Sequence, residues 1–343
     1  MIVPILAVCS PFLFTSRVLL ADDFRDYFGP HAEMARQEFR ESGELPRWNP
    51  YQYAGVPYVG AGQNNFYYPP MLLLLLLPAG RGLSILAALH LLLAAAGMYR
   101  LARSYGLRRE SAVVSGLAFG LSFCLIARLS AGHLPNFFTV CQAPVLLLLV
   151  RRAALRPDFF RFASLAGGGA LVLLAGSPQF VYQLGLLCAA LATTELAWRF
   201  RRGEAVAPAL GLMAGAFVAA LALSAVHLLP LIETATDSNR AAAEELVQPF
   251  HDFTLTQLAM LAVPRFFWHP VSDPWLGHEK ALYLGLLPLI LAAGAFRRRA
   301  RGPVYFFGAV ALVALLEALT GFLLAWLPWY GGFRIPERIV WMI

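Results

Sequence analysis

The chain has 343 residues, of which 59% are hydrophobic and only 14% are charged, and its formal net charge is +7. Its mean hydropathy of +0.63 is far above that of ordinary soluble domains, which predicts a polytopic membrane protein forming a single domain over residues 1–343. The basic residues are short arginine clusters between apolar segments, with no stripe of interleaved aromatics, so nucleic acid is excluded as a partner.

The first 20 residues are apolar but are interrupted by Pro4, Pro11 and Arg17. A cleaved signal peptide is one interpretation of such a segment. However, it lacks a basic start and ends in Leu-Leu-Ala, which is a poor cleavage context. A retained first helix is therefore favoured, although it is barely long enough to span a membrane.

Residues 21–70 form the one long polar segment between apolar ones, and we call this segment the acidic loop. Its length and its content of carboxylates, aromatics, Pro, Gly and Asn are typical of an ordered, functional loop. Asp22, Asp23 and Asp26 open it directly after the first apolar segment. Carboxylates at such a boundary are candidates for base or metal chemistry.

A helix is expected inside the acidic loop. Residues 31–42 (HAEMARQEFRES) have a helix-forming composition and are followed by Gly43, a plausible C-terminal stop. The aromatic residues after it are expected to pack this helix onto the bundle or to line an acceptor groove, and they are Trp48, Tyr51, Tyr53 and Tyr58.

The remaining chain alternates between apolar segments and polar connections. Residues 71–77 are too few to span and predict a re-entrant or interfacial piece. Further spans are predicted at residues 83–101, 111–127, 137–150, 162–175, 178–198, 205–231, 281–296 and 304–327. Together with the first helix and the start of another at the C-terminus, the sequence predicts an all-α transmembrane bundle of about nine to ten spans, several of them tilted or kinked.

Arginine placement orients the predicted spans. Arginine clusters follow the second, fourth, sixth and eighth helices, at residues 100–109, 151–161, 199–202 and 297–301. The short connections 130–135 and 176–178 on the other side contain no arginine. Because arginine-rich loops stay in the cytoplasm, the acidic loop and the second long loop, residues 233–280, are expected to be extracytoplasmic.

The same outer face collects further polar residues. His133 lies in the turn AGHLPNF, Gln179 in GSPQ, and Glu233 follows an apolar segment much as Asp23 does. A solvated loop histidine is the alternative for His133, and a hydrogen bond at a helix start is the alternative for Gln179. Glu317 is interpreted as the acid within a span, either functional or bonded to a neighbouring helix.

Several short motifs occur in a fixed order along almost the whole chain. They are Asp23, GELPRWNPY (43–51, with Trp48 and Asn49), GVP (55–57), Gln63, FYYPP (66–70), Gly132-His133, SPQ (177–179), LPLIE (229–233) with Ser238 and Arg240, and RIPER (334–338). This pattern resembles that of the YfhO-type bacterial membrane proteins. The first-loop motifs carry most of the specificity.

The resemblance implies a fold and an activity. The YfhO-type proteins are similar to the GT-C class of integral membrane glycosyltransferases, which take sugars from polyprenyl-phosphate carriers on the outer face. The resemblance implies a bacterial cytoplasmic-membrane protein. Its implied partners are a lipid-linked sugar donor, membrane lipids and an acceptor, which is an envelope polymer, a lipid or a protein. Family members continue with further helices after the last motif, so this chain, which ends at Ile343, is expected to lack them.

Site roles follow from that chemistry. Asp23 is the predicted catalytic base, with Asp26 or Asp22 orienting it, and Asp22 with Asp23 could hold Mg²⁺ or Mn²⁺. A solvated acidic cluster is the alternative to a metal site. The predicted substrate-binding residues are His133, Arg240 and Arg338, which could pair with the carrier phosphate, and Gln179, Glu233, Trp48 and Asn49.

Two other functions are compatible with the composition. A transporter or lipid flippase would be expected to show paired inverted repeats with broken central helices, and no such pairing is visible. A non-catalytic scaffold or fragment is the second alternative. The sequence does not identify the sugar, the acceptor or the oligomeric state.

Overall fold

The computed structural model describes residues 1–19, 23–60, 65–236, 286–297 and 302–321, with the isolated positions 261, 323–324, 326–328, 339 and 341–342. These residues are almost entirely helical. In them the strands are β1 (Trp48–Asn49) and β2 (Val56–Pro57), which form an antiparallel pair with Trp48 opposite Pro57. The predicted all-helical class is therefore confirmed.

The chain divides into two compact units. The first holds residues 1–120 and 129–238, and the second holds residues 121–128 and 239–343. Each is described separately below, and Asp23, His133 and the acidic loop lie in the first unit.

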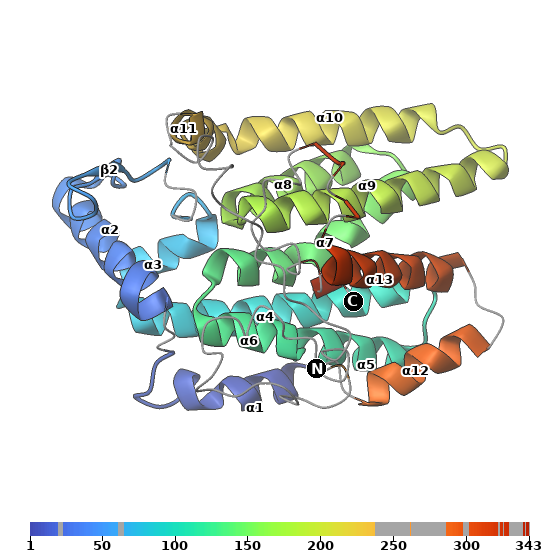
Figure 1. Cartoon of the computed structure of the whole chain (residues 1–343), viewed down its shortest axis with the longest axis horizontal. Helices are drawn as coiled ribbons and strands as arrows, with labels where there is room; N and C mark the ends of the chain where they lie inside the picture. Colours follow the sequence, from blue (N-terminus) through green and yellow to red (C-terminus); the bar gives the residue numbers. More distant parts are fainter. Residues whose placement is uncertain are drawn as a thin grey trace. The chain divides into compact units, whose positions relative to one another are not determined.

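The first unit is a helical bundle with the acidic loop at one end (Figure 1). Its main helices are α1 (Ile2–Leu13), α4 (Ala79–Ser104), α5 (Arg109–Gly120), α7 (Leu134–Leu155), α8 (Phe159–Ala175), α9 (Pro178–Arg201), α10 (Ala207–Leu223) and α11 (Ala225–Thr236). Helix α4 packs against α1, α5 and α7, and α7 packs in turn against α8, α9 and α10. These two helices therefore form the centre of the unit.

Small residues explain the close packing around α4. A Cβ atom on Gly97 of α4 would lie 2.7 Å from the Val145 side chain of α7. A Cβ on Gly120 of α5 would lie 2.8 Å from Cβ of Ala95. Only glycine permits this approach of one helix backbone to another, a device common between membrane helices.

The second unit contains the first part of α6 (Phe123–Ala131), up to Arg128. It also contains α12 (Leu286–Arg297) and α13 (Gly302–Thr320). Ala314 and Ala318 of α13 pack with Ile339. Glu317, which lies between these two alanines in the sequence, is fully buried. Its Oε2 accepts a hydrogen bond of 2.8 Å from the Leu324 backbone N–H. This acid thus stabilises the turn that follows its own helix.

Among the described residues, five helices are long and apolar enough to cross a membrane, and a sixth span is possible if α10 and α11, bent by 72°, are counted as one. The five are α4, residues 109–131, α7, α9 and α13. Helices α1, α8 and α12 are apolar but shorter than about 20 residues, the usual length of a span. All nine predicted segments contain a helix, while the count of nine to ten spans stays a prediction.

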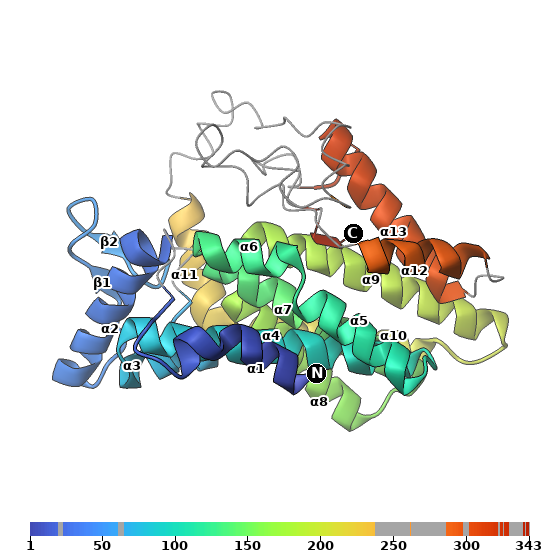
Figure 2. The same cartoon turned by 90° about the horizontal axis from the view of Figure 1, so that it is seen from below.

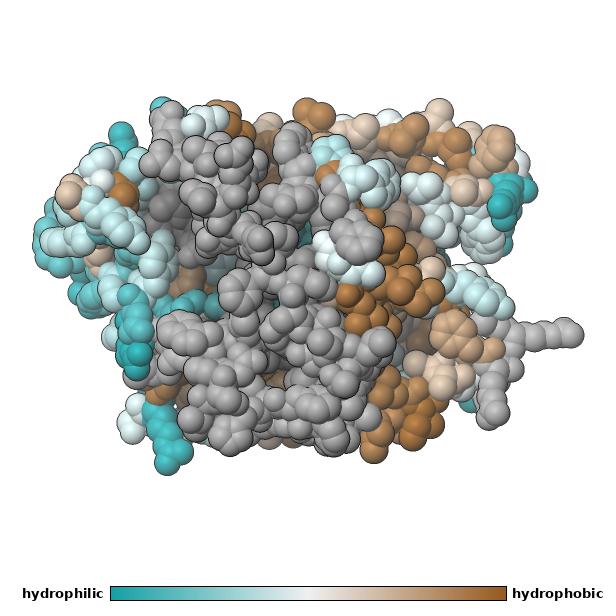
Figure 3. All heavy atoms as spheres, in the orientation of Figure 1, coloured by the Kyte–Doolittle hydropathy of each residue, from teal (hydrophilic) through white to brown (hydrophobic). Residues whose placement is uncertain are grey.

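Exposed apolar side chains occur along the helices of the bundle. Leu210, Phe217 and Val218 are exposed on α10, and hydrophobic residues cover that helix in Figure 3. Hydrophilic residues gather instead at the end where α2 lies. Exposed apolar surface of this kind is characteristic of helices that face lipid.

The acidic loop is folded at one end of the first unit (Figure 2). Helix α2 (Gly29–Ser42) ends at Gly43, whose φ of 75° is left-handed, so the predicted helix and its glycine stop are confirmed. The predicted short apolar run is a 3₁₀ turn, Pro69–Leu72, followed by α3 (Leu73–Leu76). Together they lead the chain into α4.

Candidate functional site

Asp23 stands at the start of a single π-helical turn, Phe24–Phe28, that joins the first segment to α2. Phe24 and Phe28 are buried and hold this turn in place. Half of the Asp23 side chain remains exposed. Isolated π-helical turns are rare and often occur at functional sites, so the position of Asp23 is one at which chemistry is expected.

The turn before α7 meets this carboxylate. His133 occupies the N-cap position of α7, and its Nε2 lies 3.0 Å from Oδ2 of Asp23. The two side chains form an ion pair when the imidazole is protonated. The exposed fraction of the His133 side chain is 17%, so the imidazole is held by its surroundings while Asp23 stays accessible.

Gly132 makes this contact possible. Its φ of 80° lies in the left-handed region, which other residues rarely adopt. A Cβ atom at this position would lie only 2.6 Å from the Phe24 backbone nitrogen and 3.1 Å from Cβ of Asp23. The turn is thus packed directly on the Asp23–Phe24 peptide, and a larger residue would separate His133 from Asp23.

Buried polar contacts fix the rest of the acidic loop on the bundle. Asn65 donates a hydrogen bond of 2.8 Å to the backbone oxygen of Ala175, at the end of α8. The Tyr68 hydroxyl and Nε2 of His90 are 2.8 Å apart, and Nδ1 of His90 lies 2.7 Å from the Leu86 oxygen. Because the carbonyl can only accept, Nδ1 carries the proton, and Tyr68 donates to Nε2.

The predicted site residues do not all gather at this pair. Asp26 forms a two-pronged ion pair with Arg25 on the surface, at 2.7 and 3.0 Å, rather than a contact with Asp23. That hydrogen bonding from Arg25 lowers the pKa of Asp26 below its ordinary value. Gln179 is buried at the start of α9, and Glu233 is exposed on α11.

Trp48 and Asn49 take structural positions in the β1 strand. The Trp48 indole covers Gly55, where a Cβ atom would lie 2.6 Å from the ring. Asn49 is buried, and its Oδ1 accepts a hydrogen bond of 2.9 Å from the Tyr51 N–H. Both residues therefore shape the loop that follows α2.

Asp22, Arg240 and Arg338 lie outside the described residues, and so does most of the second long loop. Within the described part of the chain, no group of three or more His, Cys, Asp and Glu side chains is arranged to hold a metal ion. The Mg²⁺ or Mn²⁺ site therefore stays a prediction.

An ion pair that the sequence pattern does not predict lies near the C-terminal ends of α7 and α9. Glu195 of α9 is buried and is bonded to the partly buried Arg151 of α7, and Glu195 also accepts a 3.2 Å hydrogen bond from the Tyr105 hydroxyl. The Arg151 guanidinium lies 3.9 Å above the Tyr105 ring. Glu195 falls within the predicted span 178–198, where its charge was a visible signal.

No protein-family model, curated protein or solved structure gives a significant match to the chain. We therefore argue its function from the Asp23–His133 geometry and from the sequence motifs.

Proposed function

We propose that the protein is a membrane glycosyltransferase. It moves a sugar from a polyprenyl-phosphate-linked donor to an envelope polymer, lipid or protein acceptor on the extracytoplasmic face of a bacterial cytoplasmic membrane. The observation that carries this proposal is the 3.0 Å contact between Asp23 and His133. Both belong to the motif pattern that resembles the YfhO-type proteins, and two distant members of that pattern meet at one point.

The half-exposed Asp23 carboxylate is suited to act as a general base. It takes the proton of the acceptor hydroxyl while the acceptor oxygen attacks the anomeric carbon of the donor. The bond from that carbon to the phosphate oxygen breaks, and polyprenyl phosphate leaves with the bonding electrons. A single carboxylate acting in line with the leaving group accounts for an inverting transfer.

His133 acts on Asp23 rather than on the substrate in this mechanism. Its Nε2 lies 3.0 Å from Oδ2 and so restricts the orientation of the carboxylate. When the imidazole is protonated, its positive charge also stabilises the ionised form that a base requires. The role assigned to His133 thus changes from binding a phosphate to positioning the base.

The leaving phosphate needs positive charge. Arg240 and Arg338, which lie outside the described residues, are the proposed sources. A divalent cation would supply the same charge when bound, through Asp22 and Asp23.

A lipid flippase or transporter is the second candidate. The observation in its favour is the 72° bend between α10 and α11, because broken helices often form transport sites. The third candidate is a non-catalytic fragment. A flippase would move the lipid-linked sugar across the membrane without breaking its bond to phosphate, and a fragment would do neither.

The test uses the full chain in proteoliposomes with a polyprenyl-phosphate-linked sugar and envelope acceptors. Release of free polyprenyl phosphate reports transfer. Asp23→Asn keeps the shape but removes the base, and it should lower the rate on the order of 10²-fold or more.

The matched control is Asp158→Asn. Asp158 caps α8 by accepting a hydrogen bond from the Arg161 N–H, and asparagine caps a helix equally well. This variant should transfer at the wild-type rate. A wild-type rate for Asp23→Asn would show that the assigned base is wrong, and translocation of intact donor would favour the flippase.

A further inference from the structure

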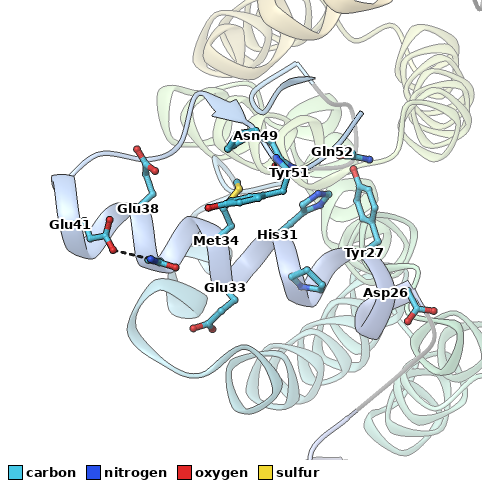
Figure 4. Close-up of a pocket in the computed structure, with 13 residues that line it drawn as sticks. Asp26, Tyr27, His31, Glu33, Met34, Glu38, Glu41, Asn49, Tyr51 and Gln52 are labelled. Atoms are coloured by element: carbon cyan, nitrogen blue, oxygen red, sulfur yellow. Dashed lines mark hydrogen bonds between the residues drawn. The ribbon is translucent and has the colours of Figure 1, made fainter. Parts of the chain in front are cut away.

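The acidic loop contains a groove that the transfer mechanism above does not use. Its volume is about 570 Å³, within the range of about 300–1,000 Å³ typical of small-molecule sites. One wall is a stripe along α2, and the other is the segment Asn49–Gln52 that follows it (Figure 4). The π-helical turn contributes Asp26 and Tyr27 at one end.

The α2 wall is a continuous face of the helix. It consists of Pro30, Glu33, Met34, Gln37, Glu38 and Glu41, with His31 beside them. Their spacing of three or four residues places them on one side of a helix. Eleven residues of helix rise about 16 Å, so the groove is elongated and suits a chain-like ligand better than a compact ion.

The groove is strongly acidic. Asp26, Glu33, Glu38 and Glu41 line it, while no Arg or Lys does. Arg25 and Arg36 neutralise Asp26 and Glu33 from outside the groove. Among the described residues no ion pair neutralises Glu38 or Glu41, and Glu41 accepts a hydrogen bond of 2.9 Å from the neutral amide of Gln37. An anionic ligand is therefore disfavoured, and a cationic one is favoured.

Tyrosine rings add to the attraction for a cation. Tyr51 is 85% exposed, and Figure 4 shows it alongside Met34 and His31. Asn49 fixes the backbone of Tyr51 through the bond to its N–H. Tyr27 lines the same groove from the π-helical turn. The face of a tyrosine ring attracts an ammonium group, and its flat surface also covers the apolar face of a sugar ring.

His31 has a polar atom without a partner. The side chain lines the groove, is only 8% exposed, and its Nδ1 makes no hydrogen bond. Burial lowers the pKa of His31 below its ordinary value, and a hydrogen bond with Gln52 offsets this in part. The ring is therefore neutral near pH 7. A buried polar atom left unsatisfied in this way is normally satisfied by a ligand or by water.

The groove and the proposed base belong to one segment. The turn that begins at Asp23 contributes Asp26 and Tyr27 to the groove. We propose that the groove binds the acceptor of the transfer reaction, and that this acceptor is an oligosaccharide carrying protonated amines. The carboxylates and tyrosines hold the amines, while Gln37, Asn49 and Gln52 bond the hydroxyls. This inference rests on the proposed function, because it assigns the substrate of the same site.

Binding is tested directly, without the transfer reaction. The full chain in lipid nanodiscs is titrated with a glucosamine trisaccharide, its N-acetylated counterpart and a glucose trisaccharide. The glucosamine trisaccharide should bind at least about tenfold more tightly than the two neutral ones, because only it carries ammonium groups. Its affinity should fall as salt is added.

Variants locate the binding in the groove. Glu38→Gln with Glu41→Gln, and separately Tyr51→Ala, should each weaken the glucosamine trisaccharide at least about tenfold. Glu44→Gln and Tyr53→Ala are the matched controls. Glu44 is exposed, Tyr53 is 86% exposed, and neither lines the groove. Both controls should bind as the wild type does.

Several outcomes would overturn the inference. They are equal affinity for all three trisaccharides, no binding of any, binding that the groove variants do not change, or equally tight binding of trilysine, which would assign the groove to cationic peptides. Failure of the proposed transfer is recognised separately. Binding of the trisaccharide without release of polyprenyl phosphate would support the binding site and contradict the transferase activity.

Discussion

Asp23 and His133 are separated by 110 positions in the sequence, and yet Oδ2 of one lies 3.0 Å from Nε2 of the other. The contact joins the start of the acidic loop to the start of α7, one of the two central helices of the first unit. The carboxylate is therefore held by the most buried part of that unit while one side of it remains open. Base catalysis needs this combination of fixed position and access.

Substitution of His133 tests the positioning role. His133→Ala removes the N–H donor to Asp23 and should reduce transfer about 10- to 100-fold, the value of a hydrogen bond to a charged group. His133→Gln retains a neutral N–H donor and should restore most of the rate. Initial rates across the pH range check this. If glutamine fails to rescue and the pH profile changes shape, the imidazole transfers a proton itself.

Gly132 can be compared with a glycine that has the same backbone conformation but no neighbour. Gly106 has a φ of 82°, and nothing lies within 4 Å of a Cβ atom built on it. Gly106→Ala should therefore cost about 1 kcal/mol from its backbone alone and leave transfer unchanged. Gly132→Ala adds the collision with Asp23 and Phe24 and should lose transfer as well. Thermal unfolding and transfer rates distinguish the two, and equal behaviour would contradict the packing described.

The ion pair between Glu195 and Arg151 should contribute more to the free energy of unfolding than a half-exposed ion pair does. Glu195→Ala leaves the partly buried Arg151 without its carboxylate and should cost about 3–5 kcal/mol. Glu204→Ala breaks the half-exposed pair with Arg199 and should cost no more than about 1 kcal/mol. Unfolding of the detergent-solubilised chain measures both. A small effect at Glu195 would mean that the bundle relaxes to admit water to Arg151.

Acidification should loosen α2. Because the folded-state pKa of His31 is below its ordinary 6.5, the unfolded loop binds a proton more readily than the folded one. The stabilisation is complete above about pH 6.5 and is lost as pH falls toward the lowered pKa. The neighbouring Tyr27 and Tyr58 have raised pKa values and stay neutral throughout. The protection factors of the α2 amides, which remove the pH dependence of intrinsic exchange, should decrease as pH falls from about 8 to about 5 in the wild type but not in His31→Gln.

The orientation in the membrane is checked by a single cysteine. Pro50→Cys, in a chain whose four cysteines are replaced, should react in intact cells with a reagent that cannot cross the membrane, because the acidic loop is expected outside. A cysteine in place of the exposed Ser111, just after the first arginine cluster, should react only after permeabilisation. The reverse pattern would invert the proposed topology.

Local signals in the sequence were sufficient for the helices and for some of their ends. The glycine after Ser42 predicts the end of α2, and the apolar runs predict nine helical segments, which are all present. The break between α10 and α11 was less visible, since the predicted span 205–231 runs through Ser224 without interruption. Hydropathy measures how apolar a segment is, and a bend does not change that.

The partnerships of polar residues could not be predicted in the same way. Asp23 and His133 were each identified as candidates, but no local pattern says which helix ends meet. The sequence around Glu195 does not reveal its partner, because Arg151 is 44 positions away and belongs to an arginine cluster that orients the chain. In both cases the missing information is the packing of one helix on another, which depends on contacts distant in sequence.

The hydrogen bond from Asn65 to Ala175 also spans 110 positions. During synthesis the acidic loop therefore emerges long before the helix ends on which it docks. At roughly 5–20 residues per second, the ribosome needs roughly 5–20 s to supply them. Over that interval the loop has neither its anchor nor the histidine that orients its carboxylate. The nascent chain should accordingly be most open to proteases and chaperones on that face until α9 begins to emerge.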